Sequence, residues 1–417
     1  DGYLFIPSGK DGNKGFEGSF NIYDLSDPRN PALVYLHQNA DTETILEPHG
    51  YGFSEGKLAY CTLIGVSIWD VSDVSSIQKL GELDLGSGTG YGNVCWSVAY
   101  QAPYAYVGTG TGGLHVVDFS DPANPALVNS LSTVQLGGVP THNVFAVGNL
   151  LVATRTQTGA GYVTVDIRNP ANPTFIRADR SGTVPSIYSG YLNGNRIYGI
   201  GVDGNLYIHD ITDPSQFQFL GTTNSGTTDD GGYASIQDTN AFGGFSSLVA
   251  KFDVSDPNNP VMTGNGTASN IISNMDQDFA VPMGNVLMNA NDRRTGSAIM
   301  VHQLDPDTTP PVVNMVSPAD NSANQPVSSR IGITLSDMVL IESVTPNSFI
   351  VRPANGGPAL TGTYSAAFDK VNFWPDTPLQ DNTIYEVVIP AGGLSDWSGN
   401  SITDQFTSRF STGTVSA

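Results

Sequence analysis

The chain has 417 residues, of which 17 are lysine or arginine and 39 are aspartate or glutamate, so its formal net charge is −22. A surface this acidic repels nucleic acid and anionic membranes, which excludes both as expected partners. Glycine (47 residues) and proline (26 residues) are abundant, and no apolar run approaches the roughly 18 residues of a membrane span. The composition predicts an all-β protein of short strands and tight turns, without membrane insertion.

The first residues, DGYLFIPSG, already have the pattern of a strand. They contain no signal peptide, so we expect a processed or truncated start with further sequence upstream.

A pattern of two strands around an Asp-Pro turn recurs along the first 304 residues. It is clearest in LHVVDFSDPANPALV (residues 114–128), and close copies begin at Asn21, Tyr207 and Ala250. A marker position ends the third strand of each unit and recurs every 43 to 50 residues, at Asp24, Asp70, Asp118, Asp166, Asp210, Asp253 and, in a degenerate seventh copy, Gln303. This period, with short strands inside it, indicates the blades of a β-propeller.

The third unit divides into four strands, NVCWSVAY, YAYVGTG, LHVVDFS and PALVNSL. Both faces of its third strand are apolar, as expected for a blade that is packed between two neighbours. In the turn, an aspartate can accept backbone N–H groups, and Pro122 presets the backbone angle. We therefore assign the repeated aspartates to the fold and not to metal binding or catalysis.

Seven units predict a seven-bladed propeller over residues 1–304 with two incomplete blades. The first unit lacks an inner strand and the last lacks an outer one. Either upstream sequence supplies the missing closure, or the ring closes imperfectly.

The sequence LHVVDFSDPANPALV resembles the LVIVD-repeat propellers of bacterial and archaeal surface proteins. The resemblance recurs through residues 1–304, although the second unit, DVSDVSSIQKL, lacks both prolines. It implies an extracellular propeller. It implies no activity, because the family is defined by its scaffold.

Residues 305–312 (DPDTTPPV) are expected to form a stiff linker, and residues 313–414 a β-sandwich of about seven short strands. The stretches TPPVV, FWPDTPLQDNTIYEVVI and LSDWSGN resemble bacterial Ig-like domains, which implies a spacer and a means of self-assembly, with more sequence following. Pro310 and Pro311 are expected to carry this domain away from the propeller rim, so that it leaves the channel mouth uncovered. Trp397 is expected either to contact another subunit or to plug one end of the sandwich core.

Cys61 and Cys95 are the two cysteines of the chain. They could form one disulfide, but their places in the repeat do not put them in obvious contact, so two buried free thiols are the favoured expectation.

Propellers present ligands at the mouth of the central channel, on loops that lead into the inner strands. Aligning these loops gives a ring of candidate ligand-binding residues, namely His49, Trp96, His142, Tyr188, Tyr233, Asp276 and Asp278, with Cys95 beside Trp96. His49 and His142 are expected on the same face, and a His–Tyr pair (with Tyr188 or Tyr233) could exchange protons with a substrate. Arg155 and Arg180 could neutralise a uronate carboxylate.

Three interpretations of this ring remain open: residues that line a wet channel, a binding site for a glycan or protein, and a catalytic site. We favour a non-enzymatic recognition or structural module that needs no cofactor and whose partner is a protein, another subunit or an extracellular glycan. The alternative is an extracellular polysaccharide lyase or hydrolase that acts at the channel mouth.

Two groups of oxygen donors are candidate calcium sites. Asp11, Asn13 and Glu17 alternate as in half of a calcium loop, and Asp305 and Asp307 lie where a Ca²⁺ ion could stiffen the domain junction.

Overall fold

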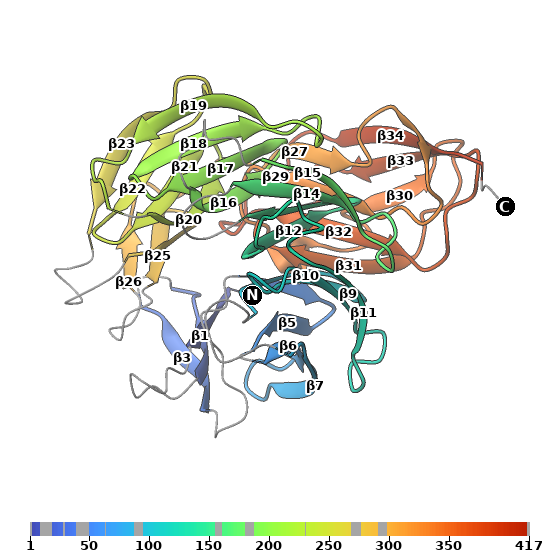
Figure 1. Ribbon diagram of the computed structural model, residues 1–417, viewed down its shortest axis with the longest axis horizontal. Coiled ribbons are helices and arrows are strands. Elements are labelled where there is room, and N and C mark those ends of the chain that lie inside the picture. Colours follow the sequence, from blue (N-terminus) through green and yellow to red (C-terminus); the bar gives the residue numbers. More distant parts are fainter. Residues whose placement is uncertain are drawn as a thin grey trace.

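The computed structural model describes residues 2–8, 19–27, 30–38, 50–62, 64–86, 95–154, 161–179, 187–229, 231–267, 277–290 and 298–414. Its regular structure is β-strand apart from one short 3₁₀ helix, Ile341–Ser343. The helix search over the same residues finds none long and apolar enough to cross a membrane. The strands form a seven-bladed propeller followed by an Ig-like sandwich, as predicted (Figure 1).

Each blade is an antiparallel sheet whose strands follow one another in chain order, and the first strands of blades 2 to 7 contact one another in succession around the axis. Blades 1 to 3 consist of β1 (Tyr3–Ser8), β2 (Ser19–Asp24) and β3 (Ala32–Gln38); β4 (Tyr51–Ser54), β5 (Lys57–Cys61), β6 (Gly65–Asp70) and β7 (Gln78–Asp84); and β8 (Ser97–Gln101), β9 (Tyr104–Gly108), β10 (Leu114–Asp118) and β11 (Ala126–Leu131). Blades 4 and 5 consist of β12 (Asn143–Val147), β13 (Leu150–Thr154), β14 (Tyr162–Asp166) and β15 (Thr174–Ala178); and β16 (Ile187–Asn193), β17 (Arg196–Gly201), β18 (Asn205–Asp210) and β19 (Gln218–Asn224). Blades 6 and 7 consist of β20 (Gly231–Gln237), β21 (Asn240–Phe245), β22 (Val249–Asp253) and β23 (Val261–Gly266); and β24 (Phe279–Met283), β25 (Val286–Ala290) and β26 (Ala298–Val301).

The two incomplete blades lie where the repeat predicts them. Blades 2 to 6 have four strands, whereas blades 1 and 7 have three. Asp24 ends β2, so blade 1 lacks an inner strand, and blade 7 ends at β26 without an outer one. Among the described residues no strand of either blade joins the sheet of the other, so side chains close the ring there.

The six marker aspartates shape turns, as the sequence predicts. Each accepts a hydrogen bond through Oδ1 from the backbone N–H two residues further on, at 2.7 to 3.0 Å, in the pairs Asp24–Ser26, Asp70–Ser72, Asp118–Ser120, Asp166–Arg168, Asp210–Thr212 and Asp253–Ser255. These bonds hold the chain as it turns from the third strand of a blade towards the outer one.

The core between blades 4 and 5 contains a histidine. His209 in β18 is 1% exposed, and neither of its ring nitrogens has a hydrogen-bond partner. Its ring packs against those of Tyr162 and Phe219, with centroids 5.2 and 5.6 Å away. Burial lowers the pKa of His209 to about 4, so it serves as an uncharged core side chain.

Acid should therefore destabilise the propeller through His209. Its folded pKa lies below the ordinary value of about 6.5, so the unfolded chain takes up a proton first as the pH falls. The free energy of unfolding should fall between about pH 6.5 and pH 4, by roughly 3 kcal/mol at most. Urea unfolding of the protein and of His209→Leu at both ends of this range measures the effect. An equal loss in both proteins would assign it to other groups.

Cys61 and Cys95 form a disulfide, so the expectation of free thiols is wrong. Cys61 ends the second strand of blade 2 and Cys95 precedes the inner strand of blade 3. They occupy different positions in the repeat, but adjacent blades face each other, and the two Cα atoms lie 5.3 Å apart. That separation falls within the range of disulfide-bonded cysteines. The bond links blades 2 and 3.

Reduction of this disulfide should destabilise the protein by about 3–4 kcal/mol, because the bond closes a loop of 34 residues that the reduced unfolded chain no longer has. Guanidinium unfolding with and without a reductant measures the difference. The chain has two cysteines, so a Cys61→Ala/Cys95→Ala variant should match the reduced protein and show no response to the reductant. A response in that variant would mean that the reductant acts elsewhere.

The second domain is a sandwich of two sheets. One contains β27 (Val313–Ser317), β29 (Ile331–Leu335), β32 (Lys370–Pro375) and β31 (Gly362–Ala367); the other contains β28 (Ser322–Gln325), β34 (Phe406–Thr412), β33 (Ile384–Ile389) and β30 (Ile350–Pro353). Buried apolar side chains from both sheets, among them Val351, Phe373, Tyr385 and Phe410, form its core.

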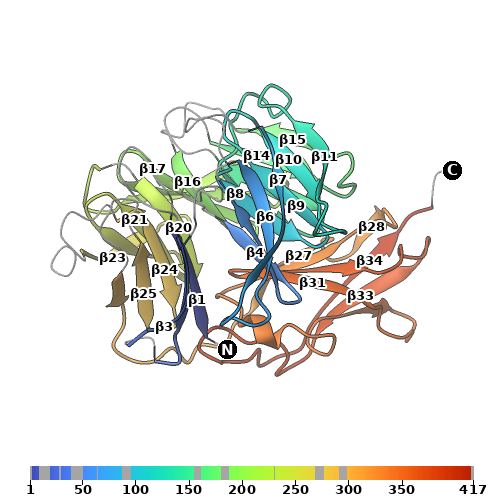
Figure 2. The same cartoon turned by 90° about the horizontal axis from the view of Figure 1, so that it is seen from below.

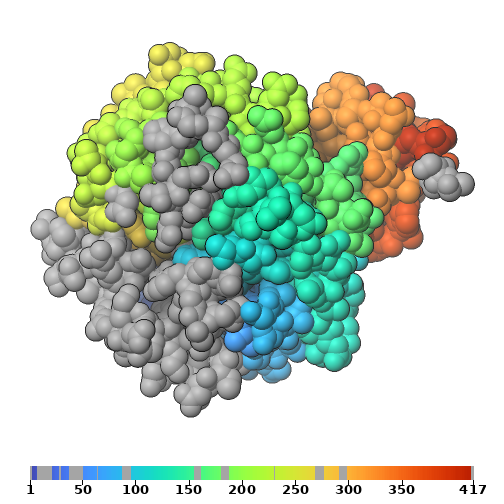
Figure 3. Space-filling view, viewed as in Figure 1, coloured from blue at the N-terminus to red at the C-terminus, as the bar shows by residue number. Residues whose placement is uncertain are grey.

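This domain docks against the propeller (Figure 2). Ala366 of β31 pairs with Phe53 of β4, so the sheet of blade 2 continues into the sandwich as one eight-stranded sheet. Hydrogen bonds reach blades 4, 5 and 6, in the pairs Asn149–Ser317, Gly194–Thr334 and Asp238–Ser336. The outer part of the domain extends beyond the outline of the blades (Figure 3).

The prediction that the linker carries the domain away from the propeller is therefore wrong. Pro310 and Pro311 keep the linker locally extended, but two prolines do not decide the direction in which the chain leaves the rim. The packing of the two domains decides it.

The seam between blades 1 and 7 is filled partly by the second domain. Leu25 of blade 1 clusters with Met283 and Val286 of blade 7, and Met338 and Trp397 of the sandwich pack against them. Trp397 is partly buried and lies in this seam, which was neither of the places expected for it. The second domain thus helps to close the ring.

Candidate functional site

The inner strands end in polar side chains that bind the second domain. The last residues of β4, β8, β16 and β20 are Ser54, Gln101, Asn193 and Gln237. Each donates a hydrogen bond to the linker or the sandwich, in the pairs Ser54–Tyr364, Gln101–Asn372, Asn193–Leu335 and Gln237–Asp337, at 2.7 to 3.2 Å. In blade 4 the N–H of Gly148, directly after β12, donates to Asn372 at 2.8 Å. This end of the propeller is therefore the face on which the second domain docks.

The hairpin between β31 and β32 brings two charged side chains against the inner strands. Asp369 and Lys370 are 1% and 4% exposed and form an ion pair. Asp369 also accepts hydrogen bonds from the Tyr191 hydroxyl at 2.5 Å and from the Asn193 amide at 2.6 Å. The ammonium of Lys370 lies 4.1 Å from the ring centre of Tyr191 and 4.9 Å from that of Phe145.

Burial shifts the protonation of these groups. It lowers the pKa of Lys370, although the charge of Asp369 opposes the shift. Burial and the same carboxylate raise the pKa of Tyr191 well above its ordinary value. The hairpin borders a small cavity beside the inner strands, lined by Gly50, Tyr51, Ser97–Tyr100, Val144–Ala146, Ala367, Phe368, Lys370 and Asn372. The sandwich therefore covers one end of the channel.

A buried guanidinium anchors the domain at blades 3 and 4. Arg330 is 1% exposed, and its Nη1 donates to the Tyr106 hydroxyl at 2.6 Å and to the Ile167 carbonyl at 3.0 Å. The guanidinium lies 3.8 Å from the ring centre of Trp374. Burial lowers the pKa of Arg330, and within the described residues no carboxylate pairs with it. Aromatic rings and neutral acceptors therefore hold this charge.

At the opposite end of the inner strands the structure brings together part of the predicted ring. The rings of Trp96 and His142 meet edge to face at 4.7 Å, and those of Tyr188 and Tyr233 at 5.9 Å. Tyr233 stacks on Phe279 at 4.2 Å, and its N–H donates to the carbonyl of Asp278 at 2.7 Å. Phe279 was not predicted, although it begins the inner strand β24 and Tyr233 lies near the beginning of the inner strand β20.

These mouth residues differ in exposure. Trp96, His142, Tyr233 and Asp278 are 5–7% exposed, whereas Tyr188 is partly exposed. His49 and Asp276, with Arg155 and Arg180, lie outside the described residues, as do Asp11, Asn13 and Glu17. The pairing of His49 with His142 therefore stays a prediction, and Tyr188 is the described candidate best placed to touch a ligand.

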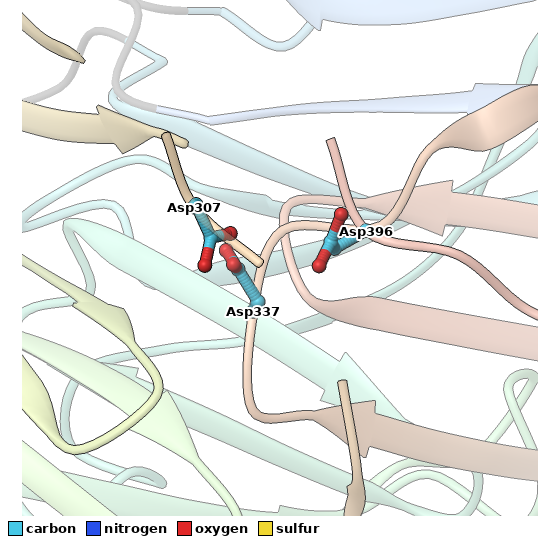
Figure 4. Close-up of side chains that lie close together, drawn as sticks. All are labelled: Asp307, Asp337 and Asp396. Carbon is cyan, nitrogen blue, oxygen red and sulfur yellow. The ribbon is translucent and has the colours of Figure 1, made fainter. Parts of the chain in front are cut away.

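The two junction aspartates have different surroundings. Asp305 is exposed, whereas Asp307 is 8% exposed and lies with Asp337 and Asp396. The carboxylates of these three residues converge between the linker and two loops of the sandwich (Figure 4). Sequence reasoning missed Asp337 and Asp396, since each lies in a turn-rich segment with no metal-ligand spacing.

The chain is similar to known families in two segments. The LVIVD repeat matches residues 92–133, and the bacterial Ig-like domain matches residues 307–412. No curated protein matches the sequence.

Solved structures match the propeller. The β-propeller domain of Cps50 (Swd1) from Myceliophteria thermophila is 12% identical, with a TM-score of 0.53 over 72% of this chain and 93% of that one. A protein of Bacteroides uniformis assigned as a 6-phosphogluconolactonase is 11% identical, with a TM-score of 0.55 over 74% and 98% of the two chains. At these identities the likeness shows the fold alone.

Fold and sequence together define a β-propeller with a C-terminal bacterial Ig-like domain. The chain carries an LVIVD repeat within that propeller, and both sequence families are typical of extracellular bacterial proteins. This combination is that of a surface or structural module.

The buried ion pair allows a direct test of the docking. Asp369→Asn should destabilise the protein by about 3 kcal/mol or more, because Lys370 is left buried without its counter-charge. The double variant Asp369→Asn/Lys370→Met should recover much of this loss, since it removes both charges and keeps the apolar stem. Chemical unfolding of the two variants and the parent measures the coupling. Equal losses in the single and double variants would show that the pair is not the source.

Proposed function

We propose that this protein is an extracellular recognition module that binds a glycan at the channel mouth opposite the Ig-like domain. The observation that carries the proposal is the docking of the sandwich on one end of the inner strands, which leaves the other end for a ligand. Aromatic side chains gather at that end, and aromatic walls with a few polar groups are typical of ligand sites.

Three features support an extracellular location. A disulfide suits an oxidising compartment. The net charge of −22 favours solubility and repels anionic surfaces. The two family matches point the same way. A partner protein at the same mouth, and self-assembly through the sandwich, remain alternatives.

Tyr188 gives the sharpest test of the mouth. Tyr188→Ala should weaken binding to a glycan found on a glycan array by about tenfold or more, because the partly exposed ring is the described candidate that can reach a ligand. The matched control is Phe219→Ala in the outer strand of the same blade, where the ring is 49% exposed. The control should bind as the parent does. Equal loss in both variants, or binding of no glycan by the parent, would refute the proposal.

The enzymatic alternative rests on the location of His142, Tyr188 and Tyr233 at one end of the propeller. A lyase acting on an acidic polysaccharide creates an unsaturated uronate by proton abstraction and elimination, which raises the absorbance at about 235 nm. We expect no such increase, because His142 is 7% exposed and its ring packs against Trp96. An increase that His142→Ala abolishes would replace the binding proposal with a catalytic one.

A further inference from the structure

An amine and a carboxamide from different domains share one buried carboxylate. Lys370 of the sandwich hairpin donates to Oδ1 of Asp369, and Asn193, the last residue of β16, donates from Nδ2 to Oδ2 of Asp369 at 2.6 Å. All three side chains are buried. One carboxylate therefore holds the amine on one oxygen and the amide on the other, where the two domains meet.

The amine also lies over the face of β16 that carries the amide. Tyr191 and Asn193 are two residues apart in this strand, so their side chains project from the same face. The Lys370 ammonium lies 4.1 Å from the ring centre of Tyr191, and the Tyr191 hydroxyl donates to Oδ1 of Asp369 at 2.5 Å. Lys370 and the Asn193 amide are therefore brought to one place by two independent sets of contacts.

The Asn193 amide is fixed at its nitrogen and at its oxygen. Nδ2 also donates to the carbonyl of Leu335 at 2.7 Å, and Oδ1 accepts a hydrogen bond from Nδ2 of Asn314 at 3.0 Å. A donor on the oxygen of a carbonyl group stabilises the negative charge that develops there when a nucleophile adds to the carbon. The amide is thus both positioned and polarised.

The surroundings of Lys370 favour a nucleophilic amine. Burial lowers the pKa of Lys370, against the opposing charge of Asp369. The ring centre of Phe145 lies 4.9 Å from Nζ, so aromatic rings surround the amine in place of water. A desolvated lysine amine is a nucleophile, and the carboxylate bonded to it is in place to take its proton.

We propose that Lys370 and Asn193 form an amide cross-link that joins the sandwich to the propeller. Asp369 takes a proton from the ammonium, and the free amine attacks Cγ of Asn193. The Nζ–Cγ bond forms and the Cγ–Nδ2 bond breaks. Asp369 passes the first proton to Nδ2, which leaves as ammonia, and takes the second proton from Nζ. The ammonia carries that proton away as ammonium, so no oxidant or other co-reactant is consumed.

The docking of the domains controls this reaction. The nucleophile belongs to the sandwich and the amide to blade 5, so the two groups meet only in the docked protein. The ion pair of Lys370 and Asp369 is the state before the reaction. Formation of the cross-link removes the buried positive charge of Lys370, whose desolvation is costly, and makes the docking permanent.

Mass spectrometry of the full chain tests the cross-link. With the Cys61–Cys95 disulfide reduced, the intact mass should be lower than that of the sequence by one ammonia, about 17 Da. Asn193 precedes Gly194, and cyclisation of an Asn-Gly pair loses the same mass, so peptides must locate the change. Trypsin should release one branched peptide that contains both Asn193 and Lys370 and is uncleaved after Lys370.

Two variants and one control complete the test. Lys370→Arg keeps the positive charge, but a guanidinium stays protonated and is no nucleophile, so this variant should have the full mass of its sequence. Asp369→Asn should also have the full mass, because no group then takes the proton. The control is Lys79→Arg, at a lysine of the outer strand of blade 2 that pairs with Glu82. It should lose ammonia as the parent does.

Three results would overturn the proposal. They are the full sequence mass in the parent, a loss of ammonia found in linear peptides alone, and a loss of ammonia that persists in Lys370→Arg. The mass and the peptides of the parent decide the question even where a variant fails to fold.

Discussion

The ring of this propeller closes through side chains, and the rest of the architecture depends on that closure. In the described structure, blades 1 and 7 each have three strands, and neither contributes a strand to the other. The seam relies on apolar contacts among Leu25, Met283 and Val286. Like the other junctions between blades in the described structure, this seam has no backbone ladder across it, and it joins the two blades that have three strands instead of four. Met338 and Trp397 add apolar contact there from outside the propeller. The second domain is therefore a structural part of the ring.

The docking face has a second consequence for stability. Polar side chains at the ends of inner strands, such as Gln101 and Asn193, are buried in the two-domain protein and bonded to the sandwich. Buried groups of this kind are costly when their partners are removed. The two domains are thus matched chemically as well as in shape, and we expect them to fold as one cooperative unit.

Sequence periodicity predicted the blades because the marker aspartates make the same turn bond in six units, and local bonds of this kind leave a local signal.

The polar residues that end the inner strands also left a signal, since Ser54, Gln101, Asn193 and Gln237 recur at one repeat position with no partner inside the blade. This recurrence was not interpreted as a face that binds the second domain. The docking itself has no local signature, because Tyr106 and Tyr191, the rings of the propeller that Arg330 and Lys370 contact, lie more than one hundred residues away in the chain. The disulfide escaped for a similar reason, since it joins unlike positions of adjacent repeats. The common direction of the inner strands places Trp96, His142, Tyr188 and Tyr233 at one end of the propeller, whereas their role in ligand binding stays a prediction.

The eight-stranded sheet that runs from blade 2 into the sandwich has a mechanical consequence. Tension applied to β34, in the sandwich sheet that does not pair with the propeller, would enter the propeller through the Ala366–Phe53 bridge and through hydrogen bonds to blades 3 to 6 at the same time. Bonds loaded side by side share a force, whereas a propeller pulled by one end strand would unravel blade by blade. A force applied to the Ig-like domain would thus be distributed over most of the blades of the ring.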